Sequence, residues 1–227
     1  KLIKKFSSIA TGETLSGAIG SIFWLYLASL LTVSDYGEIQ FLIGIASFGV
    51  GLSLIAQANT IIVYEIKQRD LRGILFLLSF IMAGIVSVIL FIIYSRLDIV
   101  ILSFGMICAE MAIGYLVGGK LFIKYSIFLI SQKILMIVLA IGLYFLMDIE
   151  GIIYGIAISY IPVTILVFST FKNTSFNFSL LKNNFGFIFY NYLERLIIFS
   201  RRNLDKLIIM PILGFEILGE FALGLQI

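Results

Sequence analysis

Long apolar runs constrain this chain more than any other feature. They lie near residues 12–31, 39–63, 73–94, 98–118, 125–147, 150–171 and 185–210. A bilayer core is about 30 Å thick and a helix rises about 1.5 Å per residue, so about 20 apolar residues make one crossing. A further apolar run begins near Glu216. We therefore expect an all-α, polytopic membrane bundle with short connections and no soluble domain.

The composition supports this class and excludes several others. Hydrophobic residues make up 61% of the chain and charged residues 13%, whereas charged residues are about 25% of a soluble domain. Cys108 is the only cysteine and histidine is absent, so an internal disulfide is excluded. Zinc chemistry and histidine-dependent catalysis are correspondingly disfavoured. We expect no metal, no cofactor and no enzymatic activity, with membrane lipids and not nucleic acid as partners.

The basic residues predict an orientation. If the N-terminus is cytoplasmic, the inner segments hold Lys1, Lys4, Lys5, Lys67, Arg69, Arg72, Lys120, Lys124, Lys172 and Lys182, and the outer loops hold only Arg96. This bias follows the positive-inside rule. It predicts a multi-pass protein of the cell membrane with a cytoplasmic N-terminus.

One stretch has a loop-like composition. The sequence KNTSFNFSLLKNN follows the sixth run, and we interpret residues 172–184 as a cytoplasmic linker. It would separate a six-helix transmembrane lobe, residues 1–171, from the start of a second lobe, residues 185–227. The chain begins without Met and stops inside an apolar run, so we interpret it as part of a longer protein.

The seventh run carries an unusual set of charges for a membrane helix. Its charged residues are Glu194, Arg195, Arg201, Arg202, Asp205 and Lys206. At about 100° per residue they fall within about 140° of the helix circumference. A charge at membrane depth costs about 2.5 kcal/mol or more, so these side chains must face water, one another or a ligand. Arginine offers a planar fork suited to phosphate oxygens, so a phosphate or diphosphate is the ligand that fits best.

Polar residues in other runs are further candidates. Glu110 lies near the middle of its run and is expected to face the bundle, and Lys133 lies about two turns from an inner end. Gln57 and Asn59 either bond a neighbouring helix or contact a polar substrate. The cavity candidates are Arg195, Arg201, Arg202, Lys206, Lys133, Gln57 and Asn59. Candidates for ion pairing are Glu110, Glu194 and Asp205.

Smaller features predict how the helices pack. Glycines at GxxxG spacing, at 114 and 118 and at 151 and 155, allow close approach of helix backbones within the bundle. Pro162 is expected to bend its helix, with or without a functional consequence. Glu13 is interpreted as a carboxylate that stabilises a helix N-terminus.

The segment NLDKLIIMPILGFEILGEFALGLQI, residues 203–227, carries a resemblance. It resembles the seventh and eighth helices of polysaccharide-biosynthesis flippases, in the superfamily that also contains the multidrug and toxic compound extruders. The matching residues are Asp205, Lys206, Leu213, Gly214, Gly219, Phe221 and Ala222. The sequence SDYGEIQF, with Tyr36 and Gly37, resembles the family's first outer loop.

The resemblance implies a function and a mechanism. Two lobes would form a V around a cavity and move a polyprenyl-linked oligosaccharide from the inner to the outer leaflet. Cations of the seventh helix would hold the diphosphate or acidic sugars, and an H⁺ or Na⁺ gradient would drive alternating access through Glu110, Glu194 or Asp205. The oligomeric state stays open.

Other interpretations remain open at this point. One is an antiporter for drugs or small organic cations, which a surplus of positive charge disfavours. Another is a membrane glycosyl- or phosphotransferase, which needs paired carboxylates, whereas those of the outer turns are expected to be isolated. A third is a non-transporting scaffold. The charged run could also end near Ser200, with its charges at the outer interface.

Overall fold

The computed structural model describes residues 2–55, 58–67, 71–172, 174 and 176–225, apart from the side chains of residues 2–7 and 202. Nearly all of the described residues are helical and none lies in a strand, which confirms the all-α prediction. The helices are α1 (Leu2–Leu30), α2 (Val33–Ser53), α3 (Ala58–Ile66), α4 (Arg72–Tyr94), α5 (Leu97–Gly118), α6 (Phe122–Ile158), α7 (Ile161–Lys172) and α8 (Phe178–Gly224).

Five helical segments are long and apolar enough to cross a membrane, and the chain is accordingly a multi-pass membrane protein. They are Val33–Ile66, Arg72–Tyr94, Leu97–Gly118, Phe122–Lys172 and Phe178–Gly224. Helix α1, which contains the expected first span, is not among them. Its middle carries Thr11, Glu13, Thr14 and Ser16, which lower its apolar character.

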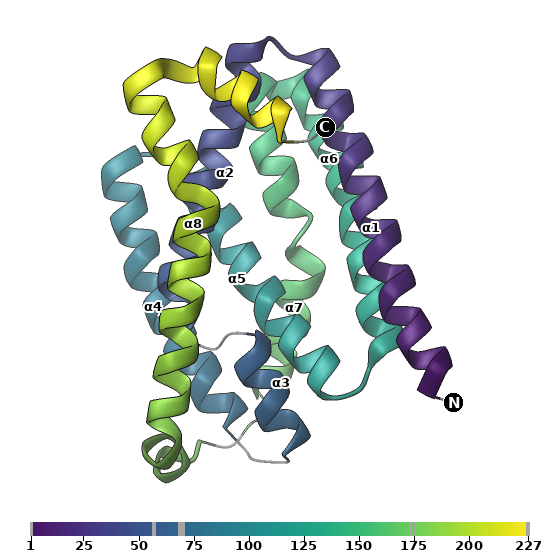
Figure 1. Ribbon diagram of the computed structural model, residues 1–227, viewed down its shortest axis with the longest axis vertical. Helices are drawn as coiled ribbons and strands as arrows, with labels where there is room; N and C mark the ends of the chain where they lie inside the picture. Colours follow the sequence, from purple (N-terminus) through teal and green to yellow (C-terminus); the bar gives the residue numbers. More distant parts are fainter. Residues whose placement is uncertain (1, 56–57, 68–70, 173, 175, 226–227) are drawn as a thin grey trace.

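The segment Phe122–Lys172 contains two arms. Met147 and Asp148 leave the helical conformation inside α6, Asp148 with φ 52°. The chain reverses there, so the arms match the separate runs predicted at 125–147 and 150–171 (Figure 1). Gly155 packs directly on the backbone of Ala140 in the opposite arm. The expectation of close packing through GxxxG glycines within the bundle is confirmed here.

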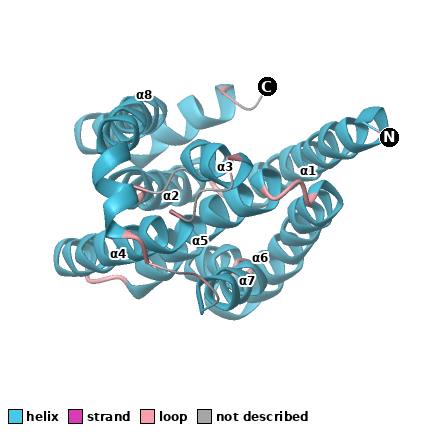
Figure 2. Ribbon diagram, turned by 90° about the horizontal axis from the view of Figure 1, so that it is seen from below, coloured by secondary structure: helices cyan, strands magenta, loops and turns pink. Residues whose placement is uncertain are grey.

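Helix α5 lies at the centre of the bundle. It packs against α2, α3, α4, α6 and α7, and Figure 2 shows it surrounded by other helices. Gly114 and Gly118 lie directly against Ile61 and Glu65 of α3, which confirms the second predicted pair of packing glycines. Polar or charged side chains on the inner faces of α5 therefore point into the protein and away from lipid.

Helix α8 packs mainly along α2, and its end folds over the top of that helix. Gly214 has φ +84°, a left-handed value that glycine adopts without strain, and the chain turns there. Residues 215–224 then cross the upper end of α2 (Figure 1), where Gly37 contacts the backbone of Phe215 and Gly219 contacts that of Val33. Within the described residues the eighth apolar run forms this short cross-piece.

Two expected loops are helical. The residues of SDYGEIQF form the first turns of α2, which Thr32 caps by accepting a hydrogen bond from the Asp35 N–H at 3.2 Å. Such N-caps satisfy a free amide of the first turn, so the helix begins earlier than its apolar residues suggest. Residues 178–184, expected within the linker, form the first turns of α8.

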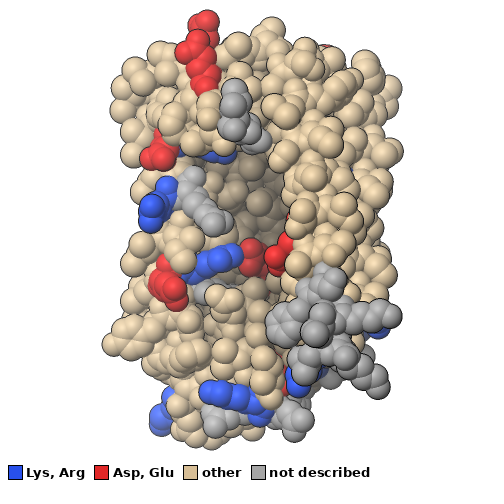
Figure 3. Space-filling view, turned by 45° about the vertical axis from the view of Figure 1, so that its right-hand side comes forward, with Lys and Arg blue, Asp and Glu red and all other residues tan. Residues whose placement is uncertain are grey.

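The two ends of the bundle differ in charge. The lower end in Figure 1 carries the connections from α3 to α4, from α5 to α6 and from α7 to α8. Figure 3 shows basic side chains gathered at this lower end, while the acidic side chains of the same face lie around mid-height and at the upper end. This distribution agrees with the charge asymmetry from which the cytoplasmic side was predicted.

Candidate functional site

A polar cavity of about 360 Å³ lies among α2, α5, α6 and α8. Its walls are Ser47, Val50, Met106, Ala109, Glu110, Ile113, Phe128, Leu129, Gln132, Lys133, Tyr160, Arg195, Phe199 and Asn203. All four helices belong to segments apolar enough to cross a membrane. Figure 3 shows a hollow in the face of the molecule with basic and acidic side chains along its border.

An ion pair connects two walls of the cavity. The Arg195 guanidinium of α8 donates from Nη2 to Glu110 Oε1 of α5 at 2.8 Å. Its Cζ lies 4.8 Å from the centre of the Phe199 ring, one turn further along α8. Glu110 therefore faces the interior, as its position in the run predicts. The buried Arg195 Nε has no hydrogen-bond partner within the described part of the chain.

Lys133 of α6 supplies a second cation. Its ammonium lies beside Gly20 of α1, where a Cβ atom would come 3.8 Å from Nζ, an ordinary van der Waals contact. Lys133 makes no ion pair or hydrogen bond with any residue that the structure describes. With Arg195 paired to Glu110, Lys133 is the one cation among the described side chains of the cavity that has no counter-ion there.

The break between α6 and α7 shapes the far wall. Pro162 lies in the first turn of α7, just beyond the Ser159–Tyr160 turn, and confirms the predicted bend. Ser159 accepts a hydrogen bond from Gln132 Nε2 at 3.0 Å, which fixes that amide in the wall. The same turn brings Tyr160 to the cavity. Sequence reasoning missed Tyr160, although the proline two residues later marks the turn.

The charges of α8 are divided between two directions. Arg195 and Lys206 are half-buried toward α2 and α5, whereas Glu194, Arg201 and Asp205 are exposed. Of the charged residues of this helix whose side chains the structure describes, Arg195 alone lines the cavity. The reason is their spacing, because positions 194, 201 and 205 lie about 100° around the helix from 195 and 206. The side chain of Arg202 lies outside the described residues.

Lys206 reaches a different helix. Its Nζ donates to Gln40 Oε1 of α2 at 2.7 Å, and its stem lies along Gly44, one turn below Gln40. Asn59 is exposed on α3 and does not line the cavity. Gln57 lies outside the described residues. The cavity candidates predicted from sequence are therefore spread over separate places.

Glu13 does not occupy a helix N-terminus, so that interpretation is wrong. Helix α1 begins at Leu2, and Glu13 lies three turns inside it. Its Oε1 accepts a hydrogen bond from the Tyr125 hydroxyl of α6 at 3.0 Å. This contact holds α1 to α6 on the side of the bundle opposite α8.

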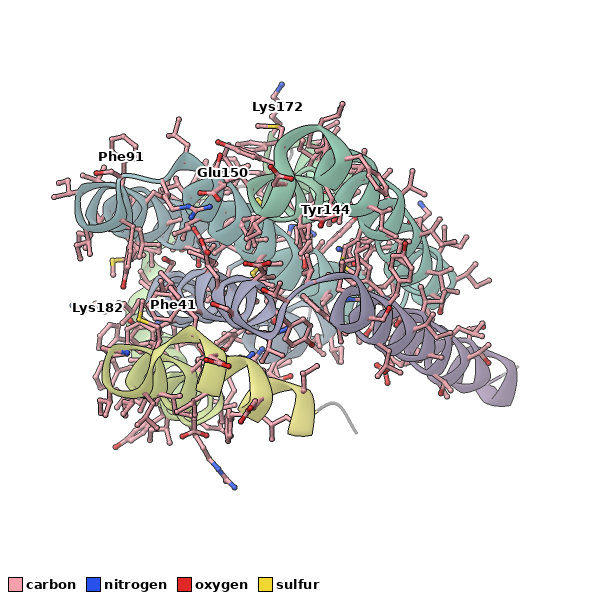
Figure 4. The ribbon with its side chains drawn as sticks, turned by 90° about the horizontal axis from the view of Figure 1, so that it is seen from above. Phe41, Phe91, Tyr144, Glu150, Lys172 and Lys182 are labelled. Atoms are coloured by element: carbon pink, nitrogen blue, oxygen red, sulfur yellow. The ribbon has the colours of Figure 1, made fainter. Side chains whose placement is uncertain are left out.

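A second ion cluster joins helices at the upper end. Arg96 contacts Asp98 at 2.8 Å, Glu38 at 3.2 Å and Glu150 at 4.0 Å. The prediction that Glu38 and Glu150 are isolated is therefore wrong. Hydrogen bonding to the Asp98 carboxylate raises the pKa of Arg96. Figure 4 shows Glu150 at this end of the molecule and Phe41 at the contact of α2 with α8.

Neither ion cluster suggests a metal centre. No group of three or more His, Cys, Asp or Glu side chains within the described part of the chain could hold a metal ion.

The comparisons with known proteins found no family model, no curated protein and no solved structure that matches this chain.

Proposed function

We propose that the protein moves a polyprenyl-linked oligosaccharide from the inner to the outer leaflet of the cell membrane. The N-terminus would lie in the cytoplasm, and the cargo would enter from the lower, basic end of the bundle. The observation that carries this proposal is a polar cavity between helices apolar enough to cross a membrane, with Arg195 and Lys133 in its walls.

The electrostatics of the cavity favour an anionic cargo. A cation at membrane depth is expensive and persists where it serves a polar pathway or a bound ion. Arg195 is paired with Glu110, but Lys133 is not paired within the described residues, so an entering diphosphate meets a net positive charge. The amides of Gln132 and Asn203 each donate one N–H within the protein, to Ser159 and to the Phe199 carbonyl, and each has a second N–H that can donate to the cargo. The same excess of positive charge disfavours an antiporter for organic cations.

Glu110 supplies a way to couple transport to an ion gradient. Its carboxylate occupies the place on Arg195 that a phosphate oxygen of the cargo would take. When the cargo displaces it, the carboxylate becomes an unpaired charge, which a proton or Na⁺ would neutralise. Among the carboxylates predicted for this role, Glu194 and Asp205 are exposed and do not line the cavity, so Glu110 is the coupling residue we propose.

A glycan-export complementation assay tests the proposal. We expect the double variant Glu110→Gln with Arg195→Gln, and separately Lys133→Met, to lose export while reaching the membrane in normal amounts. The double variant removes both charges together and so avoids an unpaired charge in the bilayer. Arg201→Gln is the matched control, because that arginine is exposed on the same helix and does not line the cavity. It is expected to export normally.

A binding measurement distinguishes an anionic, diphosphate-bearing cargo from an organic cation. The purified protein in lipid nanodiscs should bind farnesyl diphosphate, a short isoprenoid diphosphate, and not a cationic dye. Normal export by both cavity variants, or binding of the dye in preference to the diphosphate, would refute the assignment.

A further inference from the structure

An apolar cavity of about 350 Å³ lies between α4 and the lower part of α8. Its walls include Leu78 and Met82 of α4 and extend along α8 from Leu181 to Tyr192, and we name it the lower cavity. Helices α4 and α8 lie on two sides of α2 (Figure 2) and pack against it, but not closely against one another. The side chains in the walls are aliphatic, thioether or aromatic, so the space between the two helices is lined by apolar groups.

The one side-chain hydroxyl in these walls is already bonded. The Tyr192 hydroxyl donates to the Leu52 carbonyl, in the last turn of α2, at 2.9 Å. Carbonyls at the end of a helix lack an amide partner within the helix, so this bond satisfies Leu52 and uses the hydroxyl. The side chains of the lower cavity therefore offer water no free partner, and a site of that kind is filled by apolar groups.

The dimensions of the lower cavity suit a single hydrocarbon chain. Leu181 and Tyr192 are 11 residues apart, so the cavity extends about 16 Å along α8. Its volume then corresponds to a channel about 5 Å across, whereas a helix with its side chains is about 10 Å across. A length of about 16 Å is also close to half of the bilayer core of about 30 Å, which is the depth of one leaflet.

The lower cavity is open to lipid, and a lysine lies at its lower end. Phe185 and Phe189 stack on one another in its wall and are both exposed on a helix apolar enough to cross a membrane. Lys182 follows Leu181 directly, is exposed, and makes no ion pair with any residue that the structure describes. Seen from above, Lys182 lies beside the gap between α4 and α8 (Figure 4). A lysine at a membrane surface attracts anionic lipid.

We propose that the lower cavity binds one acyl chain of an anionic phospholipid from the leaflet at the lower end of the bundle, with the lipid phosphate on Lys182. The cargo of the polar cavity fits this space less well, because the two cavities share no lining residue. The inference is therefore independent of the proposed function. A bound chain supplies the contacts that α4 and α8 do not make with one another.

Native mass spectrometry of the purified chain, released from detergent micelles, tests the proposal. The chain is incubated with equal amounts of phosphatidylglycerol and phosphatidylcholine, and we expect one retained phospholipid per chain, with phosphatidylglycerol preferred. Met82→Trp, which fills the cavity from α4, should lose the retained lipid. Ile92→Trp is the matched control, because it adds the same side chain to an exposed position of α4 outside the cavity, and it should retain the lipid.

A second pair of variants tests the headgroup contact. Lys182→Gln should reduce the preference for phosphatidylglycerol about fivefold, the effect of one lysine near an anionic surface, and should still retain a phospholipid. Lys172→Gln is the matched control, because this lysine is also exposed but lies on another side of the bundle (Figure 4). An unchanged preference in Lys182→Gln would refute the contact between Lys182 and the phosphate.

Cross-linking of the unmodified chain keeps the test independent of whether a variant folds. Phosphatidylglycerol with a diazirine in its acyl chain should label Met82 and Phe185 in preference to Ile92. Labelling spread evenly over the outward residues, or no retained phospholipid, would overturn the proposal. Displacement of the phospholipid by farnesyl diphosphate would assign the cavity to the cargo, and a dimer that Met82→Trp abolishes would assign it to a second copy, so either result would also overturn it. Met82→Trp should still bind farnesyl diphosphate, so failure of this inference leaves the proposed function intact.

Discussion

Replacement of Arg195 by glutamine probes the ion pair on which the cavity is built. The variant leaves Glu110 without its cation inside a helix apolar enough to cross a membrane, while the reciprocal variant Glu110→Gln leaves Arg195 unpaired. The double variant removes both charges. These three variants with the unmodified chain form a double-mutant cycle.

The size of the effect follows from geometry and exposure. Two unit charges about 4 Å apart interact by about 4 kcal/mol at an effective dielectric constant of about 20. Nη2 of Arg195 and Oε1 of Glu110 are 2.8 Å apart, and each side chain is 24% exposed, so water screens part of this interaction. We expect a coupling energy of about 2–3 kcal/mol, equivalent to about a 30- to 160-fold change in the unfolding equilibrium.

Equilibrium unfolding in mixed micelles, with SDS as the denaturant, measures this coupling. Each single variant should lower the unfolding midpoint clearly, whereas the double variant should lie within about 1 kcal/mol of the unmodified chain. Arg201→Gln is the control, because this arginine is exposed on the same helix, and its midpoint should not change.

Additive single variants would refute this reasoning. A coupling energy below about 0.5 kcal/mol would mean that water screens the pair as at a protein surface. Water in the cavity would then screen the two charges too strongly for Glu110 to stabilise Arg195 as its counter-ion.

The remaining predictions concern the upper end and helix packing. Arg96→Gln should destabilise the fold by about 2 kcal/mol in the same assay, because it leaves the buried Asp98 carboxylate without a counter-ion. Glu150→Gln should cost under about 0.5 kcal/mol, because the Glu150 side chain is 63% exposed. Because the pKa of Arg96 is raised in the folded protein, Arg96 contributes fully to stability at every pH below the ordinary arginine pKa and stops contributing only above it. The decrease in unfolding free energy caused by Arg96→Gln should therefore be the same at pH 7 and pH 9. Gly37→Ala should cost about 1–3 kcal/mol, because its Cβ would meet the backbone oxygen of the kinked end of α8, whereas Gly142→Ala meets no atom and should be neutral or stabilising.

The length and spacing of the apolar runs predicted the helical class and most of the helices. The reversal at Met147 and Asp148 lies between two predicted runs, and the bend at Pro162 was expected from the residue type. Helix starts were harder to predict. The N-cap at Thr32 extends α2 through residues that look like a loop, because a capped polar turn is stable even though it adds little apolar surface.

The candidate site was only partly readable from the sequence. Glu110 and Lys133 stand out because charges are rare within apolar runs, and both line the cavity. Tyr160 and Asn203 do not stand out, since residues of these types occur in membrane helices without any special role. Their positions follow from a helix break and from the face that α8 turns toward α2.

The sequence by itself determined that the chain crosses a membrane several times and that charges lie within its spans, because transfer into lipid depends on residue type and run length. Only the tertiary structure decided which charges meet. Arg195 with Glu110, Lys206 with Gln40, and Arg96 with Glu38 each join segments far apart in sequence. Those pairings depend on the rotation and close approach of packed helices, which glycines at the contacts permit and which local sequence does not specify.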